Sequence, residues 1–286
     1  MKYYAAVVNE DEIKAACLIP PRQILASYHY FKTKPELIRG LVMQHYDVLI
    51  DSGAFSAANS NKEIDIEDYC KFIKETGVLT YAGLDVIGDA AATRSNTEYM
   101  IKQHGLNPIP TFHMGSKLED LDKLLEYRYI ALGGLVFSSG VESHCDEVWS
   151  YILRRKPNIR VHGFGLTNID LMSRYPWYSV DSSSFKSCKR FGRQNVLWNG
   201  FDWKSIDEDE YIAHLRELGF DVPDVRKKST AVDKDDEAAI TAANKRRWFL
   251  YDFFGAQSYK IYGAHLKELN KHRKFDFLTN QQRLFD

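Results

Sequence analysis

Short apolar runs alternate, over the first 200 residues, with longer segments whose apolar positions recur at helical spacing. The runs end in Gly, Asp or Ser and are apolar enough for buried parallel strands. We expect strands at residues 3–8, 23–27, 48–50, 79–84, 108–112, 130–135, 160–164 and 178–180. The segments between them have mixed apolar and charged faces and are predicted to be helices, at residues 34–45, 66–75, 96–104, 118–127, 142–155 and 168–173.

This alternation predicts an α/β protein. Neither a GxGxxG loop nor a Walker-type loop follows the first strand, so a (β/α)8 TIM-like barrel is favoured over a dinucleotide-binding sheet. After Phe185 the pattern changes to a basic and aromatic stretch, then a helix at 208–218, a polar stretch at 221–236 and a helical tail. We therefore assign residues 1–200 to the catalytic barrel and 201–286 to a C-terminal helical and basic elaboration that completes it.

Composition narrows the class of protein. The 286 residues are 44% hydrophobic and 27% charged, with no apolar stretch of about 18 residues, which excludes a disordered chain and predicts no membrane partner. The 38 basic and 39 acidic residues give a net charge of −1, so any site for a polyanion must be local. Acidic residues in MKYYAAVVNEDE interrupt what would be the apolar core of a signal peptide, so we expect a cytoplasmic protein.

The cysteines indicate neither a metal site nor a disulfide framework. They are spread along the chain, with no CxxC and no Cys/His cluster. Reduced, buried thiols are the expected state, and we expect no metal and no cofactor.

Candidate chemistry lies where the predicted strands end. In a barrel, the C-terminal ends of the strands form one rim, and Asp51, Asp85 and Asp181 each follow an apolar run there. A partly desolvated pair of carboxylates can divide the roles of nucleophile and general acid/base, which suits chemistry at an anomeric carbon. A single Asp at a strand end, however, caps the next helix more often than it reacts, so the role of each one alone stays open.

Glycines and aromatic side chains accompany these carboxylates. Glycines leave room for a flat ligand on the backbone, and Phe55 and His162 could supply stacking faces. Together they suggest a planar heterocycle as the ligand. Taken alone, Phe55 is more often a core residue, and His113 is more often a hydrogen-bonded wall residue.

The strand-end segments resemble a known family. VLIDSGAFSA at 48–57 resembles the motif that carries the general base of tRNA-guanine transglycosylases, and five later segments follow in that family's order. They are LD at 84–85, FHMGS at 112–116, LGGL at 132–135, VHGFG at 161–165 and SVD at 179–181. The resemblance covers residues 45–186.

Two departures point to one branch of that family. The CxCxxC…H zinc motif of the tRNA enzymes is absent, with only Cys188 in that region, and the nucleophile segment is VDSSSF. Both features are similar to the phage and bacterial DNA-modifying branch, the DpdA-type DNA-guanine transglycosylases.

This resemblance implies an enzyme that exchanges guanine in DNA for a 7-deazaguanine. Asp181 would be the nucleophile and Asp51 the general acid/base, while Asp85 would read the Watson–Crick edge of the base and Phe55 and His162 would sandwich it. The other implied base contacts are Ser52, Gly53, His113, Met114, Gly134, Leu135 and Gly163. Met114 or His113 aligns near a base-reading glutamine that is absent here.

The implied partners are DNA with a flipped guanosine and a free 7-deazaguanine base. Asp181 would attack C1′ to form a covalent glycosyl-aspartate, and the incoming base would lose its N9 proton to Asp51. A basic cluster directly after the nucleophile is expected to contact phosphates: Lys186, Lys189, Arg190 and Arg193. Basic clusters at 226–228, 245–247 and 271–274 are weaker candidates.

Three alternatives remain open. The same fold could exchange bases in tRNA, although the zinc motif is missing. The same Asp pair could serve a nucleoside or glycoside hydrolase, in which water completes the reaction. A non-catalytic nucleic-acid-binding barrel would tolerate Asp181→Asn. The sequence does not identify which 7-deazaguanine is used.

Overall fold

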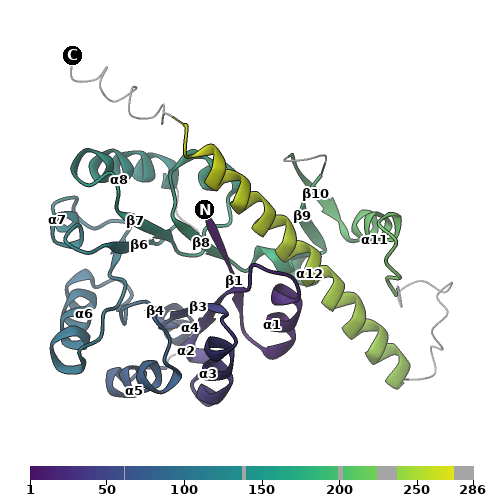
Figure 1. Cartoon of the computed structure of the whole chain (residues 1–286), viewed down its shortest axis with the longest axis horizontal. Helices are drawn as coiled ribbons and strands as arrows, with labels where there is room; N and C mark the ends of the chain where they lie inside the picture. Colours follow the sequence, from purple (N-terminus) through teal and green to yellow (C-terminus); the bar gives the residue numbers. More distant parts are fainter. Residues whose placement is uncertain (61, 137–139, 199–201, 224–236, 274–286) are drawn as a thin grey trace.

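Eight parallel strands form a closed barrel (Figure 1). The computed structural model describes residues 1–60, 62–136, 140–198, 202–223 and 237–273. The strands are β1 (Lys2–Val7), β2 (Gln23–Ser27), β3 (Asp47–Asp51), β4 (Thr80–Tyr81), β5 (Thr111–His113), β6 (Tyr129–Gly133), β7 (Arg160–Gly163) and β8 (Ser179–Ser182). Their order is β4-β3-β2-β1-β8-β7-β6-β5, and a parallel bridge between Ala82 and Ile109 joins the two ends. The predicted (β/α)8 barrel is confirmed.

Helices cover the outside of this barrel (Figure 1). They are α1 (Glu10–Cys17), α2 (Tyr28–Phe31), α3 (Pro35–Met43), α4 (Ala54–Asn59), α5 (Ile66–Thr76), α6 (Ala90–His104), α7 (Asp120–Leu124), α8 (Val141–Arg155) and α9 (Ile169–Arg174). The sequence analysis missed α1, α2 and α4 and started α6 too late. Helix α6 begins at Ala90 because the Asp89 carboxylate accepts hydrogen bonds from the N–H groups of Ala91 and Ala92.

Alternate residues of each strand point into the barrel. Side chains from four strands and from the bridge residue before β5 pack there in one apolar cluster: Tyr4, Leu25, Leu49, Ala131 and Ile109. Asp51 lies two positions beyond Leu49, and Asp181 is paired in register with Tyr4, so both carboxylates belong to the inward-facing set. All four cysteines are buried and free.

An insertion follows β8 before the barrel is completed. It contains a 3-10 turn η1 (Ser184–Lys186), α10 (Ser187–Phe191), an antiparallel hairpin of β9 (Arg193–Leu197) and β10 (Trp203–Asp207), and α11 (Glu208–Glu217). We call the described residues 184–198 and 202–223 the insertion. Helix α11 matches the predicted helix, whereas the hairpin was not predicted.

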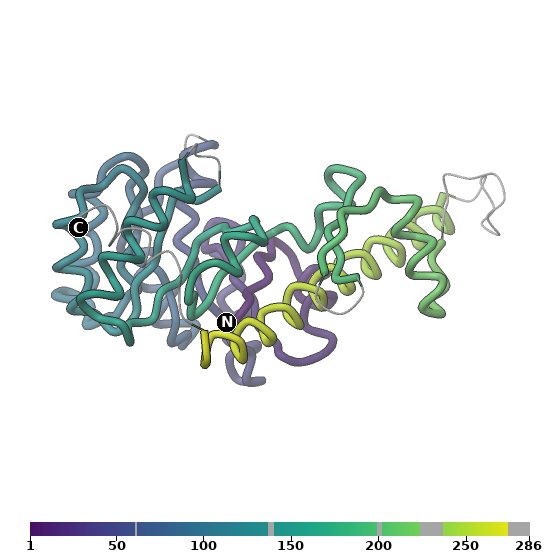
Figure 2. Tube along the Cα trace, turned by 90° about the horizontal axis from the view of Figure 1, so that it is seen from above, coloured from purple at the N-terminus to yellow at the C-terminus, as the bar shows by residue number. Residues whose placement is uncertain are grey.

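Helix α12 (Glu237–Leu269) runs from the insertion back across the barrel (Figure 2). It packs on α1, β1 and η1 and so takes the place of an outer barrel helix. Buried Lys260 donates hydrogen bonds to the carbonyls of Ala16 and Pro21, and a Cβ at Gly255 would lie 2.0 Å from the Phe185 carbonyl oxygen. Glycine at 255 therefore lets α12 approach the turn that follows β8. None of the described helices has both the length and the apolarity to cross a membrane.

Candidate active site at the barrel mouth

Asp51, Asp85 and Asp181 come together at the C-terminal mouth of the barrel, from β3, the loop after β4, and β8. Burial raises the pKa of Asp51 to about 7, and the negative charges of Asp181 and Asp85 act in the same direction. A carboxyl group with this pKa can both donate and accept a proton near neutral pH.

A tight turn holds Asp51 in place. The Gly53 N–H donates a hydrogen bond to Asp51 Oδ2 at 3.1 Å. Gly53 has a φ of 78°, and a Cβ there would lie 2.5 Å from Ser27 Oγ and 2.6 Å from His29 Cβ. Backbone conformation and space both require glycine at this position. The adjacent Ser52 is buried, so it supports the turn from inside the protein.

Asp181 is buried, and only one of its oxygens is engaged. Its Oδ1 accepts a hydrogen bond from the Gly165 N–H at 2.9 Å and lies 3.2 Å from His162 Nε2. Among the described residues, Oδ2 has no hydrogen-bond partner. The carboxylate is therefore anchored through Oδ1, and Oδ2 is free to react.

The two carboxylate oxygens of Asp85 also differ in their surroundings. Its Oδ2 lies 3.3 Å from His113 Nε2, whereas its Oδ1 is buried and has no hydrogen-bond partner in the described part of the chain. Glycine at 133 makes room for this pair, because a Cβ there would lie 3.0 Å from His113 Cδ2. The free Asp85 oxygen can accept from N–H donors of a ligand.

His162 does not have the stacking role that the sequence analysis assigned to it. Its ring is 0% exposed and contacts Tyr4 and Phe164 edge-on, inside the barrel. It occupies an inward-facing position of β7 below the rim, where both ring nitrogens find polar partners in Asp181 and Ser179. Phe164 lies two residues further along the chain and is partly exposed, so the period of two in a strand identifies it as the aromatic side chain at the mouth.

The other predicted base contacts divide into two groups. Phe55 is 58% exposed on α4, and Gly134 is exposed in a left-handed turn against Met114, with Leu135 buried beside it. Gly163 packs against Trp177, since a Cβ there would lie 3.1 Å from Trp177 Cζ3. Its missing side chain thus faces the core and leaves no space for a ligand.

The predicted phosphate-binding role of Lys186 is wrong. Its side chain is 7% exposed, and its Nζ lies 2.5 Å from Glu12 Oε2, with Glu12 also buried. This ion pair ties the turn after β8 to α1 and leaves the ammonium group inaccessible to phosphate. Glu12 requires the pairing, because an isolated carboxylate is costly to bury.

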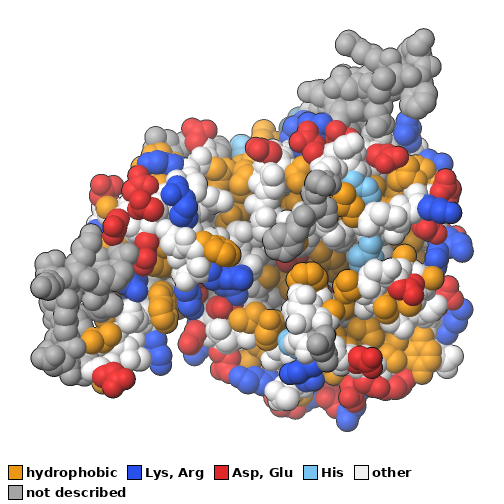
Figure 3. Space-filling view, turned by 180° about the vertical axis from the view of Figure 1, so that it is seen from behind, with side chains coloured by type: hydrophobic (Ala, Val, Ile, Leu, Met, Phe, Trp, Pro, Cys, Tyr) orange, Lys and Arg blue, Asp and Glu red, His pale blue; other side chains and the backbone are white. Residues whose placement is uncertain are grey.

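Three predicted phosphate contacts remain exposed: Lys189, Arg190 and Arg193, which we call the basic surface. Lys189 lies over the Trp248 ring at 5.0 Å, and Arg190 lies over the Phe191 ring at 5.2 Å. The predicted basic cluster at 226–228 lies outside the described residues. Elsewhere, charges of both signs are interspersed on the face seen in Figure 3, so no field of one sign covers that face.

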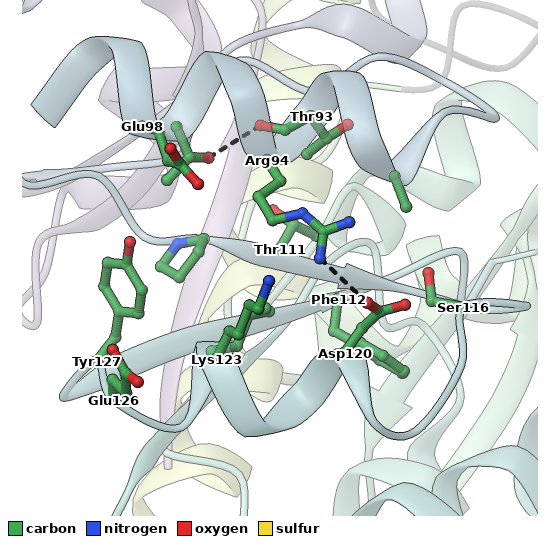
Figure 4. A pocket seen from close by; sticks show the side chains of 14 residues that line it. Thr93, Arg94, Glu98, Thr111, Phe112, Ser116, Asp120, Lys123, Glu126 and Tyr127 are labelled. Atoms are coloured by element: carbon green, nitrogen blue, oxygen red, sulfur yellow. Dashed lines mark hydrogen bonds and ion pairs between the residues drawn. The ribbon is translucent and has the colours of Figure 1, made fainter. Parts of the chain in front are cut away.

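Two cavities lie away from the mouth. One, of about 370 Å³, lies between α6 and α7, where Arg94 pairs with Asp120 at 3.0 Å and Lys123 and Tyr127 line the wall (Figure 4). The other, of about 340 Å³, lies between β9, α11 and α12. Within the described residues, no group of three or more His, Cys, Asp or Glu side chains is arranged to hold a metal ion.

Comparison with known proteins matches the chain to solved structures alone. No protein-family model and no curated protein matches the chain. Similar solved structures include ligand-free tryptophan synthase from M. tuberculosis with a mutant TrpA, at 10% identity and a TM-score of 0.42, covering 64% of this chain and 83% of that one. An open form of tryptophan synthase from the same organism with BRD0059 bound is 11% identical, with a TM-score of 0.43, and the match covers 66% of this chain and 85% of that one. The assignment as a barrel rests on the strand pairing described above.

Proposed function

We propose that this protein is a DNA-guanine transglycosylase, which exchanges guanine in DNA for a 7-deazaguanine through a covalent glycosyl-aspartate. One observation carries the proposal: Asp51, with its pKa raised to about 7, lies at the same mouth as Asp181, which is anchored through one oxygen only. The two carboxyl groups are thereby suited to different roles, a proton carrier and a nucleophile.

The first half of the reaction breaks the bond to guanine. Asp181 Oδ2 attacks C1′ of a flipped nucleotide, the bond from C1′ to N9 breaks, and protonated Asp51 gives its proton to the departing guanine. The deoxyribose is then esterified to Asp181, and the phosphodiester strand stays intact.

The second half reverses these steps with another base. A free 7-deazaguanine occupies the emptied mouth, Asp51 as carboxylate takes its N9 proton, and N9 attacks C1′. The ester bond breaks and Asp181 is released as a carboxylate. Each proton taken up by Asp51 in one half is returned in the other, so the cycle needs no cofactor.

Recognition of the base is supported by the free oxygen of Asp85. This buried acceptor suits the ring N–H and exocyclic amine of a guanine-like edge. Phe55 and Phe164 offer aromatic faces for stacking, and Gly134 and Leu135 match the base contacts that the family resemblance implies.

Binding of the polymer is assigned to the basic surface. It follows β8 in the chain and presents three exposed cations, whereas the chain as a whole is neutral. Phosphate contacts of this kind give affinity that is salt-dependent and largely independent of sequence.

The resemblance to the transglycosylase family supports the choice of substrate. Six segments in that family's order include each of the three carboxylates at the mouth, and the absence of the zinc motif favours the DNA-modifying branch over the tRNA enzymes.

Incorporation of label tests the proposal. Purified protein is incubated with guanine-containing duplex DNA or with tRNA, together with a radiolabelled 7-deazaguanine or guanine, and the label retained in the polymer is counted. We expect label in DNA that is lost in Asp181→Ala and in Asp51→Asn. Asp65→Asn, at an exposed helix cap where Asn also caps, controls for the loss of a carboxylate.

The alternative functions give different results. Label only in tRNA would identify a tRNA enzyme. Abasic sites or released base without label would identify a hydrolase. Binding of DNA that is unchanged in Asp181→Asn, with neither product, would identify a non-catalytic barrel.

A further inference from the structure

A chain of hydrogen bonds runs from Asp181 into the barrel interior. His162 Nε2 lies 3.2 Å from Asp181 Oδ1, and His162 Nδ1 lies 2.7 Å from Ser179 Oγ. Ser179 Oγ in turn lies 2.5 Å from the Tyr129 hydroxyl. His162 and Ser179 are both 0% exposed, so no solvent competes for the contact between them, whereas Tyr129 is half-buried.

The partners of each group favour one direction of donation along these contacts. Burial raises the pKa of Tyr129, so its phenol keeps its proton, and Ser179 is its only hydrogen-bond partner among the described residues. Donation from Tyr129 to Ser179 leaves the Ser179 hydroxyl to donate to His162 Nδ1. A neutral imidazole that accepts at Nδ1 carries its proton on Nε2, which faces the carboxylate.

We propose that Tyr129, Ser179 and His162 form a positioning relay that fixes His162 as the Nε2–H tautomer and thereby holds Asp181 with Oδ2 directed at the sugar. This inference rests on the proposed function, in which Asp181 is the nucleophile. The relay does not touch the substrate, since His162 and Ser179 lie beneath the carboxylate. His162 is accordingly a positioning residue, in place of the stacking residue that the sequence predicted.

The relay acts in both halves of the reaction. When Oδ2 bonds to C1′, Oδ1 becomes the carbonyl oxygen of the ester and keeps its two donors, the N–H of Gly165 and Nε2–H of His162. When the new base attacks, the bonding electrons return to the carboxylate, and the same donors stabilise the charge that forms on it. The opposite tautomer would direct a lone pair at Oδ1 and oppose this step.

A second buried tyrosine provides a matched control. The Tyr4 hydroxyl donates to Asp47 Oδ1 at 2.9 Å, and Asp47 also receives hydrogen bonds from Lys2 and Gln23. This network contains none of the relay residues. Tyr4→Phe removes the hydroxyl of a tyrosine on a barrel strand just as Tyr129→Phe does, and both hydroxyls make part-buried hydrogen bonds, but Tyr4→Phe leaves the relay intact.

The first test reads the tautomer directly. ¹⁵N NMR of protein with labelled histidine, with the His162 signals assigned through His162→Gln, distinguishes a protonated ring nitrogen from a bare one. We expect a bare Nδ1 and a protonated Nε2 in the wild type and in Tyr4→Phe, and loss of this single state in Ser179→Ala. A protonated Nδ1 in the wild type would overturn the relay. The measurement needs no turnover, so it still decides the relay if the wild type exchanges no base.

The second test measures base exchange. We expect His162→Leu to lower kcat about 100-fold and Ser179→Ala about 10-fold, with the KM for DNA unchanged. His162→Gln keeps an N–H donor and an acceptor and should recover most of the loss, and Tyr4→Phe should match the wild type. Active wild type with unchanged kcat in Ser179→Ala and Tyr129→Phe would refute the relay while leaving the proposed function in place. A rise in KM alone would refute it as well, because the residues would then act on binding.

Discussion

Replacing Asp51 with Asn should stabilise the protein, and more so at high pH. The pKa of this carboxyl is raised from 3.8 to about 7, so the unfolded chain releases the proton at a lower pH than the folded one. Each pH unit between these two values removes about 1.36 kcal/mol of stability from the wild type. The contribution of the Asp51 carboxyl to the free energy of unfolding is thus fully present below about pH 4 and is lost as the pH rises through about 7.

The expected magnitude follows from these two pKa values. The ionisation of Asp51 costs the wild type about 2 kcal/mol at pH 5 and about 4 kcal/mol at pH 8. Asn has no charge but can still accept the hydrogen bond from the Gly53 N–H. The gain in the free energy of unfolding for Asp51→Asn should therefore be larger at pH 8 than at pH 5 by about 2 to 3 kcal/mol.

Urea denaturation at the two pH values measures this gain. Ser52→Ala is the control, because it alters a buried polar neighbour that does not titrate, and its effect should be the same at both pH values. An equal gain for Asp51→Asn at pH 5 and pH 8, or a loss at pH 8, would refute the inference that the folded protein disfavours the ionised form of this carboxyl.

Three further predictions concern the turn, the ion pair and the basic surface. Gly53→Ala should lower the free energy of unfolding by more than about 2 kcal/mol. Gly77→Ala, at a left-handed position with open space, should lower it by about 1 kcal/mol. Equal shifts of the melting temperature would contradict the close approach of Gly53 to Ser27 and His29. Glu12→Gln should lower the free energy of unfolding by about 3 to 5 kcal/mol, because it leaves Lys186 unpaired. Adding Lys186→Met should restore most of this loss, as measured by denaturant titration. Additive losses in the double variant would argue against the pairing. Replacing all three residues of the basic surface with Ala should reduce the slope of log affinity for DNA against log salt by about 2 to 3, and an unchanged slope in a binding titration would remove that surface from the interface.

The barrel could be predicted because parallel strands that are buried on both faces leave a strong apolar signal. The predicted strand at 23–27 matches β2 residue for residue. The strands predicted at 79–84 and 108–112 are longer than the observed β4 and β5. The two segments pair with each other only through the bridge between Ala82 and Ile109, so fewer residues there have strand pairing. Helix α1 was missed, although Asn9 caps it and three acidic residues open it, because Glu12 lies on the buried face and interrupts its apolar pattern.

The sequence could predict that the three aspartates lie together, because the ends of parallel strands meet at one rim. It could not predict which side chains surround each aspartate. Whether Lys186 faces solvent depends on Glu12, which lies 174 positions away in the chain. In the same way, the role of His162 depends on Ser179 and Tyr129, which are contributed by two other strands. Phe164 was within reach of the sequence, because it follows His162 by two positions and so points to the same side of the strand.

The position of α12 has a consequence for how the chain folds. Helix α1 ends at Cys17, yet the helix that covers it and strand β1 begins only at Glu237. At a synthesis rate of about 5 to 20 residues per second, their apolar surface stays uncovered on the ribosome for about 10 to 50 s. Contacts of such long sequence separation also slow refolding, because much of the chain must be ordered before they form. The contact between α1 and α12 should therefore form last, and the nascent barrel is most prone to aggregation before that step.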